Sequence, residues 1–409
     1  MPAAAKSRPI AAPEPALTPS ALLERAIALR PYLRAHQAEC EALGRVPDAV
    51  NARLIAEGFY RTVQPRRFGG YEFDVPTFFR VMMEIARGCA ETGWVLALTA
   101  GHPLLVASFP EEGQREVYGK DGEFRCPASF NPPGKAVPVE GGYRITGGWA
   151  SASGIDHATH YLGGSLVVGE DGKPTDKVIQ MILDRDQFEI VDDWRVMGMQ
   201  GTGSKTVAAR DVFVPAHRTL AAVAAGRGSE PVRGPRSYDN PMYGGRVAPF
   251  LIGEAASVAV GAARGALDLY EEVVTTKKTF FPPFHERAKE ADIQHTYGRA
   301  LALVATAEAA LVGAGEEYMA FAREAAEGGH SFDDERDQRI TLIEHSCTRM
   351  AFEAVETLFR TAGTSSTAKE GQPLGRVFRN LAVIGTHPAM QLDRMAIAAA
   401  RTKFGLPPR

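Results

Sequence analysis

Two pairs of hydroxyl side chains in the middle of the sequence have a spacing that suits ligand binding. Ser151 and Ser153 stand two residues apart, so a strand there places both hydroxyls on one face. That face can hydrogen-bond a flat heterocycle, and an ordinary polar strand face fits the segment equally well. Thr202 and Ser204 lie in the glycine-rich segment 198–204, GMQGTGS, whose free N–H groups can hold a ring edge or a phosphate. Taken alone, this segment is more typical of a glycine-rich β turn.

Two histidines lie beside glycine–proline breaks. His102 stands between Gly101 and Pro103, and His387 lies in the segment 384–388, IGTHP. An imidazole titrates near neutral pH and can serve as an acid or a base, although a lone histidine is more often structural. The histidines, cysteines and carboxylates show no metal-ligand spacing, so we predict no metal site. The sequence also lacks a Gly-x-Gly-x-x-Gly that opens a helix after a strand, and it lacks a Walker-type loop, which argues against Rossmann-type dinucleotide binding.

Bulk composition sets limits on function. The chain has 409 residues, 45% of them hydrophobic and 23% charged, with a net charge of −3, which is typical of a globular protein of two or three domains. The balanced charge argues against nucleic acid or an anionic membrane as a partner. No apolar run approaches the roughly 18 residues of a membrane span. The four cysteines are far apart in the sequence, which predicts a reducing, cytoplasmic location without a zinc site or disulfide framework.

The elements that must position these groups change character along the chain. Residues 1–17 are rich in Ala and Pro and are expected to be a disordered lead-in. Helical patterns fill 18–122, a β domain is expected over 123–228, and a helical bundle over 229–409. Within the last domain the expected helices cover about 249–276, 293–327, 332–360 and 376–403. The β domain is expected to have strands separated at 132–134, 141–142 and 169–172.

The predicted fold class is α+β, mainly α, with a small β domain held between two helical ones. The seams between such domains are favoured places for ligands. The last domain contains more apolar residues than one subunit is expected to bury, so we predict oligomerisation through the bundle.

Three motifs in this order resemble the acyl-CoA dehydrogenase fold. They are 54–70, LIAEGFYRTVQPRRFGG; 198–204, GMQGTGS; and 210–215, RDVFVP. The resemblance covers nearly the whole chain and implies an N-terminal helical domain, a central β domain and a C-terminal four-helix bundle that together bind flavin. Dehydrogenases of this fold commonly carry a Glu before a Gly-Thr near the C-terminus, whereas here Ile384 precedes Gly385-Thr386. This departure puts α-proton abstraction in doubt.

The chain is more similar to the oxygenase components of two-component aromatic hydroxylases, such as p-hydroxyphenylacetate hydroxylase. Trp94 followed by His102 (102 − 94 = 8 residues) resembles their tryptophan and substrate-facing histidine. Arg379-Asn380 followed by His387 resembles their C-terminal pattern, in which the histidine lies near the C4a edge of the flavin. The resemblance assigns contact with the cofactor to seven residues, which are Trp94, Ser129, Ser151, Ser153, Thr202, Ser204 and Arg379. Ala152 replaces the first Ser of a Ser-Ser pair in that pattern.

The resemblance implies a reaction with reduced flavin, FMNH2 or FADH2, supplied by a separate NAD(P)H-dependent reductase. Oxygen would react through a C4a-hydroperoxide and hydroxylate an aromatic or heteroaromatic ring. Ser153 would hydrogen-bond flavin N5, Trp94 would shield the pocket, and His102 or His387 would act as acid or base. The resemblance also implies a homotetramer. Two alternatives stay open: a flavin-dependent acyl-CoA dehydrogenase or oxidase, and an N- or S-oxygenating monooxygenase of the same fold.

Overall fold

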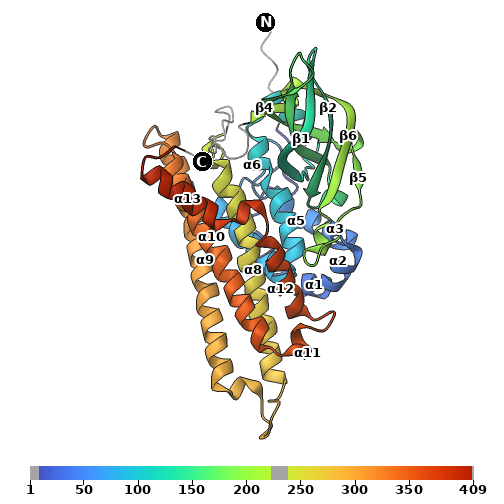
Figure 1. Cartoon of the computed structure of the whole chain (residues 1–409). Helices are drawn as coiled ribbons and strands as arrows, with labels where there is room; N and C mark the ends of the chain where they lie inside the picture. The colour runs from blue at the N-terminus through green and yellow to red at the C-terminus, as the bar shows by residue number, and fades with distance from the viewer. Residues whose placement is uncertain (1–8, 223–237, 408–409) are drawn as a thin grey trace.

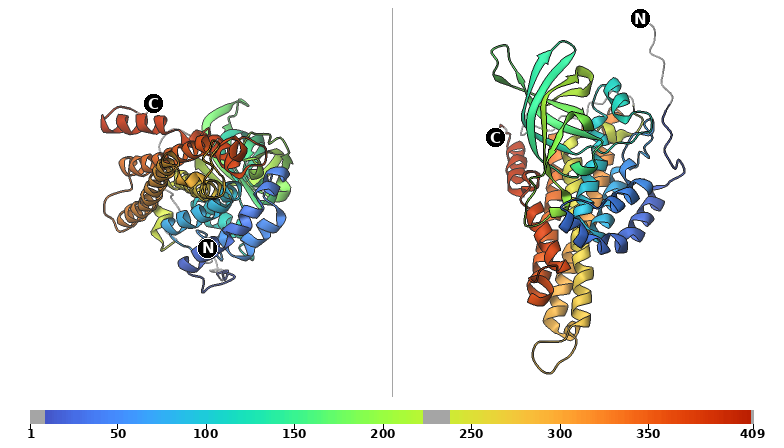
Figure 2. Two further views of the ribbon diagram at one scale, coloured as in Figure 1. Left: turned by 90° about the horizontal axis from the view of Figure 1, so that it is seen from below. Right: turned by 90° about the vertical axis from the view of Figure 1, so that its right-hand side faces the viewer.

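The computed structural model describes residues 9–222 and 238–407. The chain runs from N-terminal helices through a β domain into long C-terminal helices (Figure 1). The β domain and the N-terminal helices lie against the same end of the long helices, whose other end projects away from both (Figure 2). The three parts therefore meet at one end of the molecule.

The N-terminal part is a set of helices that pack on the bundle. Thr18 caps the first helix, because its hydroxyl accepts from the backbone N–H of Ala21 at 3.2 Å. Asp74 caps α4 in the same way through the N–H of Thr77, at 3.0 Å. The helices are α1 (Pro19–Ala35), α2 (Gln37–Leu43), α3 (Asp48–Ala56), α4 (Val75–Gly88), α5 (Ala90–Gly101), α6 (Pro103–Val106) and α7 (Glu111–Tyr118).

The β domain contains a seven-stranded sheet with the order β5-β6-β2-β1-β3-β4-β7. Only the β1–β3 pair is parallel among the strand pairs of the described chain. The fully buried Trp149 lies in the apolar core of this domain. The strands are β1 (Ala128–Val139), β2 (Gly142–Ala152), β3 (His160–Val168), β4 (Pro174–Asp184), β5 (Glu189–Val191), β6 (Lys205–Pro215) and β7 (Thr219–Ala222).

The C-terminal part is a bundle in which α8 lies at the centre. Helix α8 packs against α4, α5, α9, α10 and α12. Its small residues permit this, because the backbone carbonyl of Met83 already lies 2.3 Å from where a Cβ on Gly261 would stand. The helices are α8 (Val247–Thr276), α9 (Ala291–Ala326), α10 (Asp334–Thr361), α11 (Thr364–Thr367), α12 (Pro373–Ile384) and α13 (Leu392–Lys403).

The structure differs from the sequence-based expectations at several boundaries. Ile10 forms a parallel bridge with Phe68 and Leu17 is buried, so the described part of the expected lead-in packs on the fold. Residues 132–134 lie inside β1 and mark a register shift against β3, not a gap between strands. The helix expected over 376–403 is two helices, with His387 in the break between them. Residues 1–8, 223–237 and 408–409 lie outside the described residues.

Two helices are long and apolar enough to cross a membrane by length and composition alone, which the search for apolar runs in the sequence missed. They are α8 and α9. The apolar window of α8 is 89% buried, because α8 is the core helix of the bundle. The window of α9 is only 33% buried within the single chain. Most residues in this window of α9 are therefore not fully buried by the described part of the chain.

Candidate active site

The glycine-rich segment 198–204 is a tight loop between β5 and β6. It contains a single 3-10 turn, Gln200–Thr202, flanked by Met199 and Gly203 in the left-handed backbone region (φ 57° and 53°). Two helices hold it. Asn380 of α12 accepts from the N–H of Met199 at 2.6 Å, and Glu91 of α5 accepts from the N–H of Gly201 at 2.8 Å.

The loop also approaches α12 so closely that a side chain is excluded. A Cβ on Gly198 would stand 2.3 Å from the carbonyl oxygen of Arg379. The glycines of this segment are therefore required by close backbone approach, which the turn pattern in the sequence did not show.

A chain of hydrogen bonds joins the loop to α5 and to the end of β2. Trp94 donates its indole N–H to the hydroxyl of Ser153 at 3.1 Å. The Ser153 and Ser204 hydroxyls are 2.8 Å apart, and those of Ser204 and Thr202 are 2.7 Å apart. Thr202 then donates to the carbonyl of Met199 at 2.7 Å. All four of these polar side chains are buried. The structure thus brings together four of the residues that the sequence assigned to the cofactor.

Ser151 and Ser129 lie apart from this chain. Ser151 is exposed and has a left-handed backbone (φ 65°), so it does not share a strand face with the buried Ser153. The expectation of one common face is wrong, because β2 ends at Ala152 and the backbone turns there. Ser129, at the start of β1, donates to the carbonyl of Ala150 at 2.8 Å. Both serines stay candidates for cofactor contact from the edge of the sheet.

His387 approaches the same group of residues from the other side. Its ring lies edge-on to Trp94, with centroids 5.7 Å apart, in the break between α12 and α13. Its Nδ1 accepts from the N–H of Ala389 at 3.2 Å, which leaves Nε2 available. The imidazole retains exposed surface, and the surrounding protein removes enough water to lower its pKa.

His102 is a different kind of histidine. It is 1% exposed, and its Nδ1 donates to the carbonyl of Cys126 at 2.5 Å. Burial lowers its pKa to about 4, so the ring is neutral at pH 7 with its free lone pair on Nε2. Its edge faces Phe130 of β1 at 6.0 Å. The eight residues from Trp94 to His102 place the two about 12 Å apart along α5, so they serve different parts of the site.

Arg379 has a structural position. Its guanidinium donates to the carbonyl of Met197 at 2.9 Å and forms an ion pair with Glu41. Arg376 forms a second ion pair with Glu41, at 2.7 Å, and the two arginines hold the pKa of that carboxyl below its usual value against the opposing effect of burial. These contacts tie α12 to α2 and to the glycine loop. A direct contact of Arg379 with the cofactor stays a prediction.

Sequence reasoning missed Glu91, whose support of the loop is described above, and Glu254. Glu254 of α8 is fully buried, and neither of its carboxyl oxygens has a hydrogen-bond partner among the described residues. It lies against Gly101, beside His102, where a Cβ would stand 2.1 Å from its Oε2. Burial raises its pKa well above the usual range, because an apolar surrounding disfavours the charged carboxylate. The sequence did contain a signal for Glu254, because it is the only carboxylate among the small and apolar residues of 249–266.

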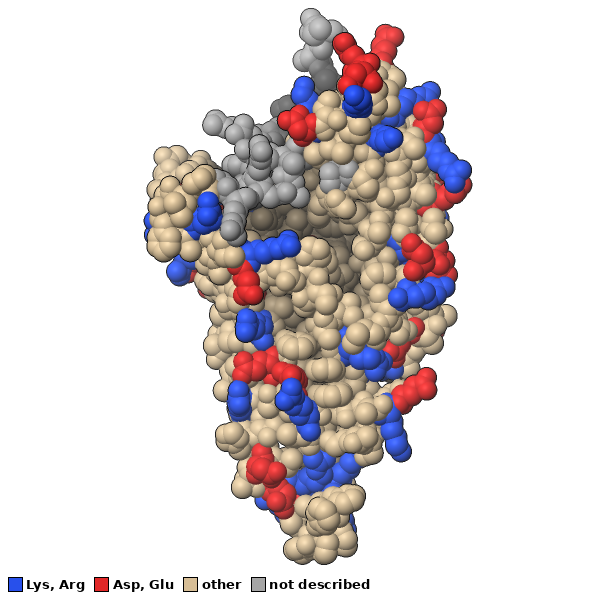
Figure 3. Space-filling model, viewed as in Figure 1, with Lys and Arg blue, Asp and Glu red and all other residues tan. Residues whose placement is uncertain are grey.

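The arrangement suits a flat heteroaromatic cofactor. Hydroxyls can both donate to and accept from the nitrogens and carbonyls of such a ring, and an indole beside them excludes water. The surface is hollowed between the β domain and the C-terminal helices on the face that Figure 3 shows. The donor set, which is rich in hydroxyls and peptide N–H groups, is therefore compatible with a flavin.

Comparison with known proteins places these features in a family. The acyl-CoA dehydrogenase N-terminal domain matches residues 27–120, and the C-terminal domain of the same family matches residues 254–392. The flavin-dependent monooxygenase oxygenase subunit HsaA of Rhodococcus jostii (strain RHA1) is 34% identical over 399 residues, which are 94% of this chain and 98% of that protein. The chain belongs to the flavin-dependent monooxygenases of the acyl-CoA dehydrogenase fold.

Other members of this monooxygenase family align over nearly their whole length. The FADH2-dependent resorcinol hydroxylase oxygenase component of Rhizobium sp. (strain MTP-10005) is 31% identical, with 97% of this chain and 98% of that protein covered. The p-hydroxyphenylacetate 3-hydroxylase oxygenase component of Acinetobacter baumannii is 26% identical, with 95% and 90% covered.

Solved structures of this monooxygenase family superpose closely on the chain. The 3-HSA hydroxylase from Rhodococcus sp. RHA1 has a TM-score of 0.86 at 30% identity and covers 95% of this chain and 98% of its own. XiaF from Streptomyces sp., in complex with FADH2 and glycerol, has a TM-score of 0.87 at 25% identity, with 95% and 96% covered. The predictions of an acyl-CoA dehydrogenase fold and of a flavin-dependent aromatic hydroxylase are confirmed.

Proposed function

We propose that this oxygenase component hydroxylates a phenol or a related heteroaromatic ring. The observation that carries the substrate class is His102, a fully buried neutral imidazole whose Nε2 lone pair can accept a hydrogen bond from an acidic O–H or N–H. When bound, reduced flavin supplies the activation of O2 and the transfer of one oxygen atom. The protein must bind and orient the ring, keep water out and hold a proton.

Each group along the seam has a role in this proposal. Ser153, Thr202 and Ser204 supply hydroxyls for the polar edge of the flavin, and Ser153 is the candidate partner of N5. Trp94 fixes the Ser153 hydroxyl and covers the pocket against water. His102 would take the phenol proton at Nε2 while the Cys126 carbonyl holds its Nδ1–H. His387, at the far side of Trp94, would serve as acid or base near the cofactor.

The alternative chemistries differ from this one at identifiable groups. An acyl-CoA dehydrogenase or oxidase needs an ionised carboxylate base, whereas burial raises the pKa of Glu254 and disfavours its ionised form. Oxygenation at nitrogen or sulfur would use the same flavin but does not need a base for a phenol. Replacement of His102 by Asn should therefore abolish phenol hydroxylation and leave oxidation of a thioether largely unchanged.

Several further features belong to the same proposal. The flavin is FMNH2 or FADH2, delivered by a separate NAD(P)H-dependent reductase. The protein is cytoplasmic, and neither nucleic acid nor a membrane is a partner. Interspersed positive and negative side chains on the face shown in Figure 3 support this. The subunits form a homotetramer, which is supported by the apolar α9, whose apolar window is only 33% buried within one chain.

A reconstitution experiment tests the proposal. The protein is combined with a flavin reductase, NADH and either FMN or FAD, and it is offered phenols, indoles and thioethers in air. We expect one oxygen atom from 18O2 in a hydroxylated phenol or indole, detected by mass spectrometry. Oxygenation confined to the thioethers would support the S-oxygenating alternative. If every compound gave one hydrogen peroxide, formed from O2, for each NADH oxidised and no oxygenated product, the proposal would be contradicted.

A further inference from the structure

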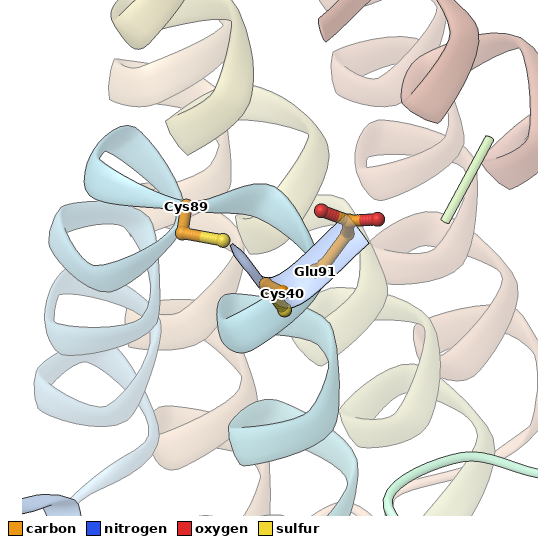
Figure 4. A group of neighbouring side chains, drawn as sticks. All are labelled: Cys40, Cys89 and Glu91. Atoms are coloured by element: carbon orange, nitrogen blue, oxygen red, sulfur yellow. The ribbon is translucent and has the colours of Figure 1, made fainter. Parts of the chain in front are cut away.

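Two cysteines that are 49 residues apart in the sequence (89 − 40 = 49) lie together beneath the glycine loop, beside a buried carboxyl. The ligand atoms of Cys40, Cys89 and Glu91 all lie within 4.8 Å of one another, and the three side chains are buried. Figure 4 shows the Cys89 sulfur directed toward Cys40, with Glu91 on the next turn of the chain. Cys40 and Cys89 are far apart in the sequence but adjacent in the fold, because the N-terminal helices fold back on one another.

From this cluster we infer a redox modification site: Cys40 and Cys89 are a dithiol that hydrogen peroxide converts to a disulfide. Hydrogen peroxide forms whenever reduced flavin and O2 react without transfer of oxygen to a substrate. This source of peroxide in the cell depends on the proposed function. The purified thiols can be tested without flavin. The two thiols would thus be oxidised when the enzyme releases peroxide instead of product, next to a pocket that the glycine loop helps to form.

The surroundings of the sulfurs favour this chemistry. Cys89 lies between α4 and α5, where the backbone is extended, so its side chain can move without breaking a helix. Contact with the Cys40 thiol lowers the pKa of Cys89, helped by Thr92 at the start of α5. The same contact raises the pKa of Cys40. The thiolate, which is the form that attacks peroxide, therefore resides on Cys89.

Glu91 can supply the proton that the reaction needs. Burial, with the nearby Cys89, raises its pKa to about 8, and its Oε2 has no hydrogen-bond partner among the described residues. The Cys89 thiolate attacks one peroxide oxygen, the O–O bond breaks, and the Glu91 proton leaves with the departing hydroxide as water. Cys40 then attacks the Cys89 sulfenic acid, the S–S bond forms, and its own proton completes the second water. Two thiols and one peroxide give one disulfide and two waters.

A small cavity reaches Cys89 and Glu91. Its lining runs from the half-buried Arg34 and Arg87 at the surface to Cys89 and Glu91 inside. Cys126 and Cys347 are also buried, but no second sulfur or carboxyl of the described chain forms such a group with either of them. The modification should therefore be selective for Cys40 and Cys89.

Disulfide formation should weaken the glycine loop. Cys40 contacts the carbonyl of Gly201 at 3.5 Å, and Glu91 accepts from the N–H of the same residue. A Cβ on Gly201 would stand 2.3 Å from the Cys40 sulfur, so the loop packs directly on this thiol. When the sulfur turns toward Cys89, the loop loses this contact, and flavin affinity should fall several-fold until a reductant restores it.

Peroxide titration of the flavin-free, full-length protein tests the site. Free thiols are alkylated after each addition, and a digest without reductant is examined by mass spectrometry. We expect a linked peptide pair of Cys40 and Cys89, reversed by dithiothreitol. The C347S variant is the matched control and should form the pair as the parent does. C40S should instead accumulate a sulfenic acid at Cys89 that dimedone traps, and E91Q should oxidise several-fold more slowly.

Three outcomes would overturn the inference. One is the absence of the linked pair in protein whose circular dichroism shows it folded. A second is oxidation of Cys126 and Cys347 at the same rate. The third is a stoichiometric metal ion in the purified protein that is lost in C40S and C89S, which would make the cluster a metal site. None of these outcomes bears on the oxygenase reaction, so the two proposals fail separately.

Discussion

At the scale of single residues, Ser153 is the polar group with the most demanding position. Its hydroxyl accepts from Trp94 and is shared with Ser204, and it is 6% exposed. Ser153→Ala leaves a buried indole N–H without an acceptor, which should cost about 1–3 kcal/mol of unfolding free energy. It should also raise the hydrogen peroxide released per product several-fold, because the flavin would lose the Ser153 hydroxyl as a hydrogen-bond partner. Chemical denaturation and a peroxide assay measure the two effects.

Ser151→Ala is the matched control for that change. The Ser151 side chain is exposed, and its left-handed backbone is strained to a similar degree with serine or with alanine at this position. We expect stability within about 0.5 kcal/mol of the parent. If the two serine variants uncouple the reaction equally, the buried hydroxyl chain is not the element that protects the oxygenating flavin.

His102 makes a prediction about pH. Its folded pKa of about 4 lies below the ordinary value of 6.5, so the unfolded chain binds the proton more tightly. Stability from this group is therefore complete above pH 6.5 and is lost as the pH falls toward 4. Between pH 7.5 and 4.5 the parent should lose roughly 2–3 kcal/mol more than His102→Gln, which keeps a donor for the Cys126 carbonyl.

Urea unfolding at several pH values checks this difference. Carboxylates and His345, whose pKa is also lowered, titrate in both proteins and cancel in the comparison. If the unfolding free energy changed with pH equally in the parent and the variant, the His102 imidazole would not be buried and neutral in solution.

At the scale of elements, the contact between α12 and the glycine loop decides whether the cofactor pocket is formed. Asn380 accepts from the N–H of Met199, which has a left-handed backbone that a side chain normally disfavours. Asn380→Ala should remove the hydrogen bond that holds Met199 in this conformation. Flavin binding should then weaken about tenfold, which is about 1.4 kcal/mol of binding free energy. Fluorescence titration with FMN and FAD measures the change. Gln294→Ala on the exposed face of α9 is the control and should bind flavin as the parent does.

The sequence predicted most elements because their signals are local. The helices over 111–118 and 249–276 follow apolar periodicity, and their observed bounds differ by at most two residues. Glycine and proline around His387 indicated a break there. The segments 376–384 and 392–403 are both helical in pattern, so the sequence predicted one helix instead of α12 and α13. The Pro-Pro-Gly at 132–134 was taken for a turn, yet a bulged strand tolerates it.

The candidate site divides in the same way. Trp94, Ser153, Thr202 and Ser204 were identified by type and motif, and the structure places them in one hydrogen-bonded chain. Glu91 and the Cys40–Cys89 contact could not be found from spacing, because they depend on how the N-terminal helices pack against a loop more than 100 residues away. Tertiary approach of this kind leaves no periodic trace in one sequence.

At the scale of the whole molecule, one end of the bundle is left exposed. The connection between α8 and α9 carries Phe280, Phe281 and Phe284, which are 87%, 74% and 62% exposed, at the tip farthest from the β domain in Figure 1. A cluster of exposed aromatic side chains is unusual on a monomer and marks an interaction surface. Helix α9 follows this connection, and its apolar window is 33% buried within the described part of the chain.

Both features are explained if copies of the chain pack through this end of the bundle. The double variant Phe280→Ser/Phe281→Ser should then shift a tetramer toward smaller species at micromolar concentration, because each lost aromatic contact removes about 1.5–3 kcal/mol of burial. Sedimentation velocity measures the shift. Phe213→Ser on β6, at 42% exposure, tests whether loss of any exposed phenylalanine has the same effect. An unchanged tetramer in the double variant would place the subunit contact elsewhere, and a monomeric parent would leave the apolar face of α9 for a different partner.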